Sequence, residues 1–155
     1  MLSAAPRYWG PGLVLIALGE ALRLWAVGHI GRKSRTRGEE VGSLAVSGPY
    51  ARLRNPLYLG NLLIFSGLGV VQWPWVLAVA PLMAWYYQQI IRWEEHNLQI
   101  KIGPAYGEYQ LRVPRWGWGK EAGEPHPWDG REALRSERST LLALGITLLV
   151  VWARS

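Results

Sequence analysis

The 155-residue sequence contains no cysteine, only one phenylalanine and few charged residues. The absence of cysteine excludes a disulfide framework, a thiolate metal site and a cysteine nucleophile. Charged residues make up 18% of the chain and hydrophobic residues 50%, a balance that excludes a solvated disordered polymer. The formal net charge is +6, which indicates a negatively charged partner, either a nucleic acid or an anionic membrane surface.

The longest uncharged stretch favours the membrane. From residue 55 to residue 91 there are 37 consecutive positions without Asp, Glu, Lys or Arg. One bilayer crossing needs about 20 apolar residues, so this run predicts two crossings joined by a turn. Pro74, between two tryptophans that suit the headgroup level, marks that turn. We therefore predict a helical hairpin with spans at about 57–71 and 75–93.

Two weaker spans flank the hairpin. Residues 8–30 are apolar but include Glu20 and Arg23, which are placed three residues apart to pair on one helix face. Residues 139–153 are uncharged and bracketed by arginines that can reach the headgroups. The sequence thus predicts an all-α integral membrane bundle of about four transmembrane helices. It forms a single domain over residues 1–155, with an irregular interfacial linker at 116–138.

The distribution of positive charge predicts the topology. Segments 31–54 and 92–138 together hold 14 of the 17 Lys and Arg residues, and the hairpin tip at 72–75 holds none. By the positive-inside rule, both basic segments face the cytoplasm, while the tip and both termini face out. Nucleic-acid binding is the rival explanation of the charge, but the sequence has no helix-turn-helix or stacking-platform pattern.

The first basic segment is predicted to end in short helical structure. Pro49 suits the first position of a short helix over 50–54. Asn55 is well placed to cap the helix that follows, with Pro56 in its first turn. These choices describe a well-capped entrance to the membrane.

The second basic segment carries two adjacent carboxylates, Glu94 and Glu95, where the chain leaves the bilayer. The membrane helix is predicted to continue through them to about Ile102, where Gly103 and a following proline stop it. A second short helix is predicted over 105–113. Carboxylates this close to hydrocarbon lose hydration, so the pair predicts a positive group nearby.

Two sequence blocks resemble the signatures of integral-membrane methyltransferases, the family that includes isoprenylcysteine carboxyl methyltransferases and phospholipid N-methyltransferases. The resemblance covers about residues 45–115, with order and spacing kept through both blocks. The first block is Gly48-Pro49-Tyr50 followed by Arg54-Asn55-Pro56-Leu57-Tyr58-Leu59-Gly60, and the second is Glu94-Glu95-x-x-Leu98 followed by Gly103-x-x-Tyr106-x-x-Tyr109-x-x-Arg112-Val113-Pro114.

This resemblance implies S-adenosylmethionine as the methyl donor, bound at the cytoplasmic face. The cofactor-binding residues that it implies are Leu44, Ala45, Tyr50, Asn55, Pro56, Leu57, Tyr58, Glu94 and Glu95. Glu94 is also a candidate catalytic residue, and His96 is a candidate base because imidazole titrates near neutral pH. No Gly-x-Gly-x-x-Gly supports a Rossmann methyltransferase, and the three histidines are too scattered to suggest a metal site.

Two departures from the family pattern bear on the substrate. Asn55 stands where the family usually has histidine, which keeps a hydrogen-bonding side chain but loses acid–base capacity. Ile90 stands where the isoprenylcysteine branch has an arginine for its carboxylate substrate, and Arg92 lies two positions further on another helix face. We therefore expect a lipid-like acceptor, a phospholipid amine in preference to a prenylated carboxylate. A membrane reductase of the sterol-reductase type and a non-catalytic membrane subunit remain alternatives.

Overall fold

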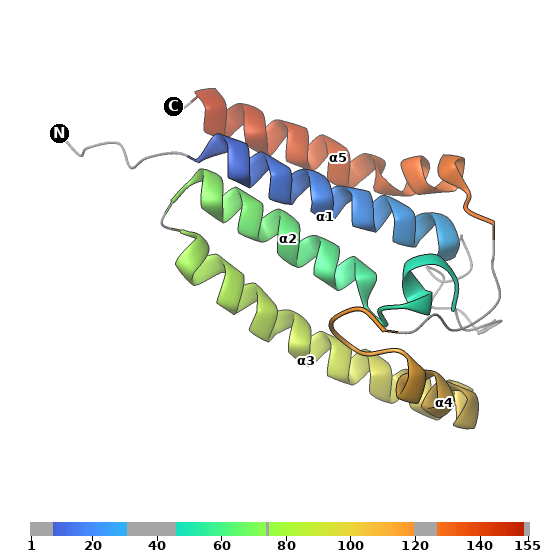
Figure 1. Ribbon diagram of the computed structural model, residues 1–155. Coiled ribbons are helices and arrows are strands. Elements are labelled where there is room, and N and C mark those ends of the chain that lie inside the picture. The colour runs from blue at the N-terminus through green and yellow to red at the C-terminus, as the bar shows by residue number, and fades with distance from the viewer. Residues whose placement is uncertain (1–7, 31–45, 74, 120–126, 154–155) are drawn as a thin grey trace.

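The computed structural model describes residues 8–30, 46–73, 75–119 and 127–153, and all the regular elements in these ranges are helical (Figure 1). This confirms the all-α class for the described part of the chain. The helices are α1 (Trp9–Ile30), the short 3-10 helix η2 (Gly48–Ala51), α2 (Pro56–Val71), α3 (Val76–Ile102), α4 (Pro104–Arg112) and α5 (Gly130–Ala153).

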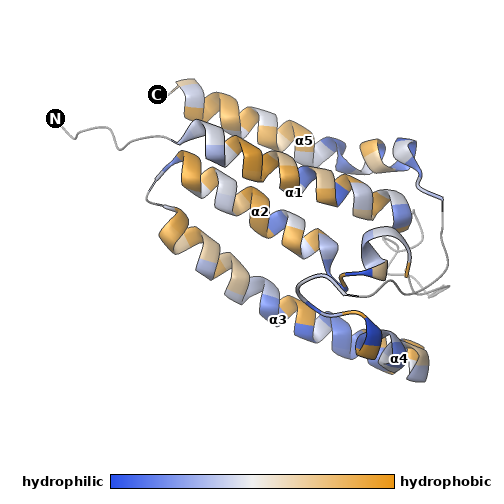
Figure 2. Cartoon of the chain, in the orientation of Figure 1, coloured by the Kyte–Doolittle hydropathy of each residue, from blue (hydrophilic) through white to orange (hydrophobic). Residues whose placement is uncertain are grey.

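The four long helices lie side by side in the order α5, α1, α2, α3, and neighbours run antiparallel (Figure 1). The α2–α3 turn, the start of α1 and the end of α5 lie at one end of the row. At the opposite end lie η2, α4 and the start of α5. Hydrophobic residues dominate the half near the α2–α3 turn, and hydrophilic residues gather at the α4 end (Figure 2). The arrangement therefore has one apolar part and one polar end.

Two of the described helices are long and apolar enough to cross a membrane, α1 and α5. The apolar helix α2 has 16 residues, about 24 Å at 1.5 Å per residue, which is less than a bilayer core of about 30 Å. α3 has the length, but tyrosine and glutamine replace aliphatic residues in its centre and charges follow from Arg92. The expectation of about four crossings is thus supported directly for two helices.

Glycines let α1 and α2 approach each other closely. A Cβ atom added to Gly19 would lie 2.6 Å from the carbonyl oxygen of Gly60, and one added to Gly67 would lie 2.6 Å from that of Gly12. The two contacts are seven residues apart on each helix, so they recur along one face. Small residues of this kind permit close backbone packing between membrane helices.

Charged and polar side chains tie α1 to α2 and α5. The Arg23 guanidinium donates to Glu137 on α5, at 3.1 Å from Nε and 2.5 Å from Nη2, and to Asn61 on α2. Glu137 is fully buried. The predicted pairing of Arg23 with Glu20 exists as an ion pair of 3.8 Å, but Glu137 is the hydrogen-bonded partner. A carboxylate from a helix distant in sequence therefore accepts from two of this arginine's nitrogens, and the third donates to Asn61.

Two sequence-based boundaries are wrong. The short helix expected over 50–54 is the 3-10 helix Gly48–Ala51, because the backbone turns with N–H groups of Arg52 and Leu53 both donating to Pro49. The segment 116–138, expected to be an irregular linker, becomes α5 from Gly130 onward. Asp129 caps that helix, since its Oδ1 accepts the N–H groups of residues 131 and 132.

Candidate functional site

Glu95 is the central residue of the polar end. It is 4% exposed and accepts hydrogen bonds from three side chains: Arg54 Nε at 3.1 Å, Asn55 Nδ2 at 3.0 Å and Arg115 Nη2 at 2.6 Å. Arg54 and Asn55 precede α2, Glu95 lies on α3, and Arg115 follows α4. One carboxylate therefore joins three parts of the chain, which confirms the positive group predicted beside the glutamate pair.

The prediction that the Asn55 side chain caps a helix is wrong. Asn55 is the residue before α2, but its side chain makes no capping hydrogen bond. Its amide nitrogen donates to Glu95 instead, and the residue is buried. A cap would use the side-chain oxygen of Asn55 as an acceptor, whereas the observed bond uses its amide nitrogen as a donor to a buried carboxylate.

Electrostatics keeps Glu95 ionised. Burial alone would raise its pKa, but the hydrogen bonds from Arg115 and Asn55 and the charges of Arg54 and Arg115 hold the pKa below its ordinary value. The same contact raises the pKa of Arg115. A carboxylate held in this way is an anchor for the surrounding chain, and its two oxygens already have partners.

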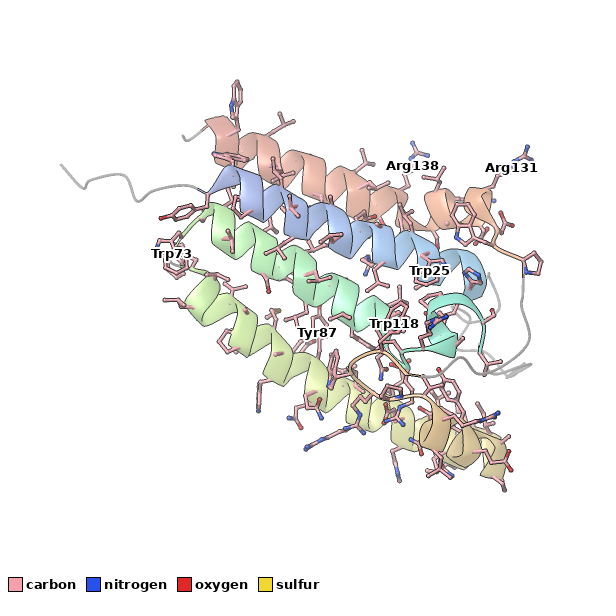
Figure 3. The ribbon with its side chains drawn as sticks, in the orientation of Figure 1. Trp25, Trp73, Tyr87, Trp118, Arg131 and Arg138 are labelled. Atoms are coloured by element: carbon pink, nitrogen blue, oxygen red, sulfur yellow. The ribbon has the colours of Figure 1, made fainter. Side chains whose placement is uncertain are left out.

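Glu94 has a different environment. It is half-buried on the neighbouring face of α3, and its Oε2 accepts a 2.8 Å hydrogen bond from the Tyr58 hydroxyl on α2. The ring of Tyr58 lies against that of Tyr87, with centroids 5.3 Å apart, and Tyr87 points from α3 toward α2 (Figure 3). Among the described residues Glu94 has one hydrogen-bond donor, so its other oxygen retains acceptor capacity.

α4 is fastened to η2 by Tyr109, and its tyrosines pack inward. The Tyr109 hydroxyl donates to the Tyr50 carbonyl oxygen at 2.7 Å, and Tyr106, Tyr109 and Val113 form a buried apolar cluster. Burial raises the pKa of Tyr106 to about 12, so this phenol stays neutral. The Gly-x-x-Tyr-x-x-Tyr spacing thus places both rings on the face of α4 that packs inward.

The segment after α4 crosses back over the site. The Arg54 N–H donates to the Pro114 carbonyl at 3.0 Å, and the Gly119 N–H donates to the Arg52 carbonyl at 2.8 Å. Trp118 lies between the Arg52 guanidinium, 5.5 Å from its ring centroid, and the ring of Trp25 on α1. Residues 114–119 therefore connect the site to α1.

A polar cavity of about 400 Å³ opens between α3 and the α4 region. Its lining residues are Arg92, Glu95, His96, Gln99, Gly107, Gln110 and Arg115. His96, the candidate base, is exposed there, whereas Glu94 faces α2 and does not line it. The two adjacent glutamates thus belong to different surroundings.

The sequence profile of the phospholipid methyltransferase family matches residues 8–103. The chain belongs to this family. The resemblance read from the two sequence blocks is thereby confirmed, and with it the assignment to a family of membrane methyltransferases. The matched region includes α1, α2 and α3 with both glutamates.

The curated relatives of this family member carry different names. The chain is 36% identical over 109 residues to protein-S-isoprenylcysteine O-methyltransferase B of Arabidopsis thaliana, covering 66% of this chain and 55% of that protein. It is 37% identical over 108 residues to cobalt-zinc-cadmium resistance protein CzcN of Cupriavidus metallidurans, covering 66% and 45%. The chain thus spans about half the length of these curated relatives. No solved structure matches it.

The family's two signature blocks meet in space. Of the residues expected at the cofactor site, Tyr50, Asn55, Pro56, Leu57, Tyr58, Glu94 and Glu95 lie where η2, α2 and α3 converge, whereas Leu44 and Ala45 lie outside the described residues. Sequence reasoning assigned no role to Arg54 and Arg115, the two arginines that bind Glu95. The sequence did contain one signal for them, because a carboxylate at the membrane edge requires a nearby cation.

In the described part of the chain, no three His, Cys, Asp or Glu side chains come together as a set of metal ligands. Between α2 and α3, Glu94 and Tyr87 of α3 instead lie together with the phenolic ring of Tyr58 of α2. A carboxylate with spare acceptor capacity suits an ammonium group, and electron-rich rings suit a sulfonium cation. The carboxylate of Glu94 and the rings of Tyr58 and Tyr87 therefore fit the charged groups at the methionine end of S-adenosylmethionine.

Proposed function

We propose that the protein transfers a methyl group from S-adenosylmethionine to a lipid-like acceptor at the cytoplasmic membrane face, with a phospholipid amine preferred. The observation that carries the proposal is the difference between the hydrogen-bond partners of Glu94 and those of Glu95. Glu95 accepts hydrogen bonds from three side chains, while Glu94 accepts one hydrogen bond, from Tyr58, among the described residues. Family membership supplies the reaction class.

S-adenosylmethionine, when bound, supplies a methyl group that is already electrophilic because it is attached to a sulfonium. The protein must bind, orient and exclude water. In this proposal Glu94 accepts hydrogen bonds from the cofactor's ammonium group, and Tyr58 fixes the Glu94 carboxylate by its 2.8 Å hydrogen bond. The rings of Tyr58 and Tyr87, whose centroids are 5.3 Å apart, would stabilise the positive charge of the sulfonium.

A phospholipid ammonium must lose a proton before its nitrogen can attack a methyl group. His96 is the proposed acceptor of that proton, because it is an exposed imidazole on α3 that lines the polar cavity. Asn55 has no such capacity, and its amide is committed to Glu95. In this proposal the acid–base role that a histidine before Pro56 could perform is therefore taken by His96 on α3.

Cofactor binding tests the proposal. Isothermal titration calorimetry of the detergent-purified protein with S-adenosylmethionine should give micromolar-range affinity. Glu94→Gln keeps the shape but removes the charge, and should weaken binding by about 1.5–3 kcal/mol, roughly 10- to 150-fold. Glu108→Gln, on the exposed side of α4, is the matched control and should bind as the wild type does. Equal affinity of the two variants would remove Glu94 from the site.

The same measurement separates the other candidates. Tight binding of a nicotinamide cofactor in place of S-adenosylmethionine would favour the reductase, and binding of neither would favour a non-catalytic subunit. A carboxyl methyltransferase is the second candidate, favoured by the identity to the isoprenylcysteine O-methyltransferase. Methyl transfer to a prenylated carboxylate but not to a phospholipid amine would select it.

The proposed orientation places η2, α4 and the cofactor site in the cytoplasm, supported by the Lys and Arg residues at that end. Because the chain lacks cysteine, single cysteines can be introduced at Gln72 in the α2–α3 turn and at Glu108 in α4, both exposed. An impermeant thiol reagent should label them from opposite sides of the membrane. Labelling of both from one side would contradict the proposed crossing of α2 and α3.

A further inference from the structure

We infer that Arg23, on α1, is a positioning residue for the proposed cofactor site between α2 and α3. Its guanidinium fixes Asn61, and Asn61 in turn fixes Tyr87 against the ring of Tyr58. The inference rests on the proposed function in taking Glu94, the hydrogen-bond acceptor of Tyr58, for the ligand of the cofactor's ammonium group. The series of contacts itself depends only on how α1, α2 and α3 pack.

The arginine reaches α2 because a glycine makes room for it. A Cβ atom added to Gly60 would lie 2.6 Å from Cγ of Arg23. Without a side chain at that position, the aliphatic stem of Arg23 lies over Gly60, and Nη1 donates to the side-chain oxygen of Asn61. Nε and Nη2 of the same guanidinium donate to Glu137 on α5. One planar group thus bonds to both neighbours of α1, which the single nitrogen of a lysine side chain would not match.

The Asn61 amide extends the contact to α3. An arginine side chain has only donors, so the amide oxygen faces Arg23 and the NH₂ group is left to donate on its other side. A side-chain hydrogen bond joins Asn61 to Tyr87, and the tyrosine oxygen is therefore the acceptor. Tyr87 is 8% exposed and points from α3 toward α2 (Figure 3). One asparagine thus links the arginine of α1 to a buried tyrosine of α3.

Tyr87 shares its helix face with the candidate cofactor ligand. Tyr87 and Glu94 are seven residues apart on α3, which returns to within about 20° of the same face. On α2, Tyr58 and Asn61 are three residues apart and meet that face. The Tyr87 ring lies 5.3 Å from that of Tyr58, whose hydroxyl donates to Glu94 at 2.8 Å. A Tyr87 ring that lost its hydrogen bond would leave the Tyr58–Glu94 pair without a fixed neighbour.

The contact with Asn61 adds to what helix association needs. α1 and α2 already approach closely, since a Cβ atom on Gly19 would lie 2.6 Å from the Gly60 carbonyl oxygen. Glu137, whose side chain is fully buried, already supplies a counter-charge to Arg23. Nη1 instead bonds to a neutral amide that faces the site. Ionisable residues within membrane helices are costly and usually serve function, which favours a positioning role for this third nitrogen.

Calorimetric titration of the detergent-purified full chain with S-adenosylmethionine tests the inference. Asn61→Leu removes the link at similar volume, and Tyr87→Phe removes only the hydroxyl. Each should weaken binding by about two- to tenfold, because one hydrogen bond is lost. The double variant should bind no more weakly than the weaker single variant, since both act on one contact. Tyr86→Phe, at the adjacent and 50% exposed position, is the matched control and should bind as the wild type does.

Arg23→Lys tests the arginine itself. It keeps a positive charge beside Glu137 but cannot bond to that carboxylate and to Asn61 with the same fork of nitrogens. It should weaken cofactor binding in the wild-type background and have no further effect in Tyr87→Phe. A role in stability alone predicts a lower melting temperature and the same change of affinity in both backgrounds. That additivity, or wild-type affinity of Tyr87→Phe, would overturn the inference.

Hydroxyl-radical footprinting without cofactor separates this inference from the proposed function. Oxidation of the half-buried Tyr58 should be at least about twofold faster in Asn61→Leu and in Tyr87→Phe, because its ring is less well held, and unchanged in Tyr86→Phe. If the wild type does not bind S-adenosylmethionine, the proposed function fails, and faster oxidation of Tyr58 retains the positioning contact. Unchanged oxidation of Tyr58 overturns the inference even where the cofactor binds.

Discussion

Glu95→Gln is the substitution that most directly tests how the polar end is held together. The change preserves the volume of the side chain and replaces one carboxylate oxygen by an NH₂ group. In the wild type, Oε1 accepts from Asn55 and Arg54 while Oε2 accepts from Arg115 at 2.6 Å. In the variant, an amide donor faces an arginine donor, and both guanidiniums lose their counter-charge.

The magnitude follows from burial. Breaking a buried ion pair by removing one partner costs about 3–5 kcal/mol. The side chains of Glu95 and Arg54 are 4% and 11% exposed, but that of Arg115 is 30% exposed and remains partly solvated. Because water compensates Arg115 in part, we expect a loss of about 2–4 kcal/mol in the free energy of unfolding.

Thermal unfolding in one detergent, followed by circular dichroism, measures this loss as a lower apparent melting temperature. Glu94→Gln and Glu108→Gln should unfold close to the wild type, since neither carboxylate bridges two arginines. Acid should act as the mutation does. The pKa of Glu95 is lowered from 4.5 by folding, so the stabilisation is fully present above pH 4.5 and is lost as the pH falls through the folded-state pKa. Coincident unfolding curves for Glu95→Gln and Glu108→Gln would refute the reasoning.

Two further predictions concern the helix row. Gly19→Ala should destabilise the protein by about 1–3 kcal/mol because its Cβ would overlap the backbone of α2, whereas Gly145→Ala, with open space around it, should be neutral or stabilising; thermal unfolding compares them, and equal melting temperatures would contradict the close α1–α2 packing. Glu137→Gln should cost about 3–5 kcal/mol, since it leaves Arg23 without its hydrogen-bonded carboxylate. Glu20→Gln should stay within about 1 kcal/mol, because Glu20 makes no hydrogen bond with any residue that the structure describes; a larger effect at Glu20 than at Glu137 would show that the arginine has been assigned the wrong partner.

Local signals predicted much of the fold. The uncharged run and the proline within it located α2, α3 and their turn, and Gly103, with a φ of 71°, ends α3 where a glycine–proline pair predicts an end. The start of α5 also carried a local signal. Asp129 followed three residues later by Glu132 has the spacing of a capping box, but the glycine- and proline-rich composition around it favoured a linker.

The candidate site was predictable as a set of residues but not as a set of roles. Motif spacing identified Asn55, Glu94 and Glu95, and it could not distinguish two adjacent glutamates. Their roles differ because successive helix positions are about 100° apart. One therefore faces Tyr58 on α2, and the other faces the arginines. Which face meets which neighbour depends on how α2, α3 and α4 pack.

The sequence by itself determined the helical class, the apolar segments, the polar end and the family, because hydropathy, helix stops and motif spacing are local properties of the chain. Only the tertiary structure decided which charges meet. Arg23 lies 114 positions from Glu137, and Arg54 lies 41 from Glu95. A buried charge needs a partner, but the sequence does not say which of several candidates packing will bring within 3 Å or so. Helix packing made that choice, and in doing so it left Glu94 open on one face of α3 and Arg92 on another.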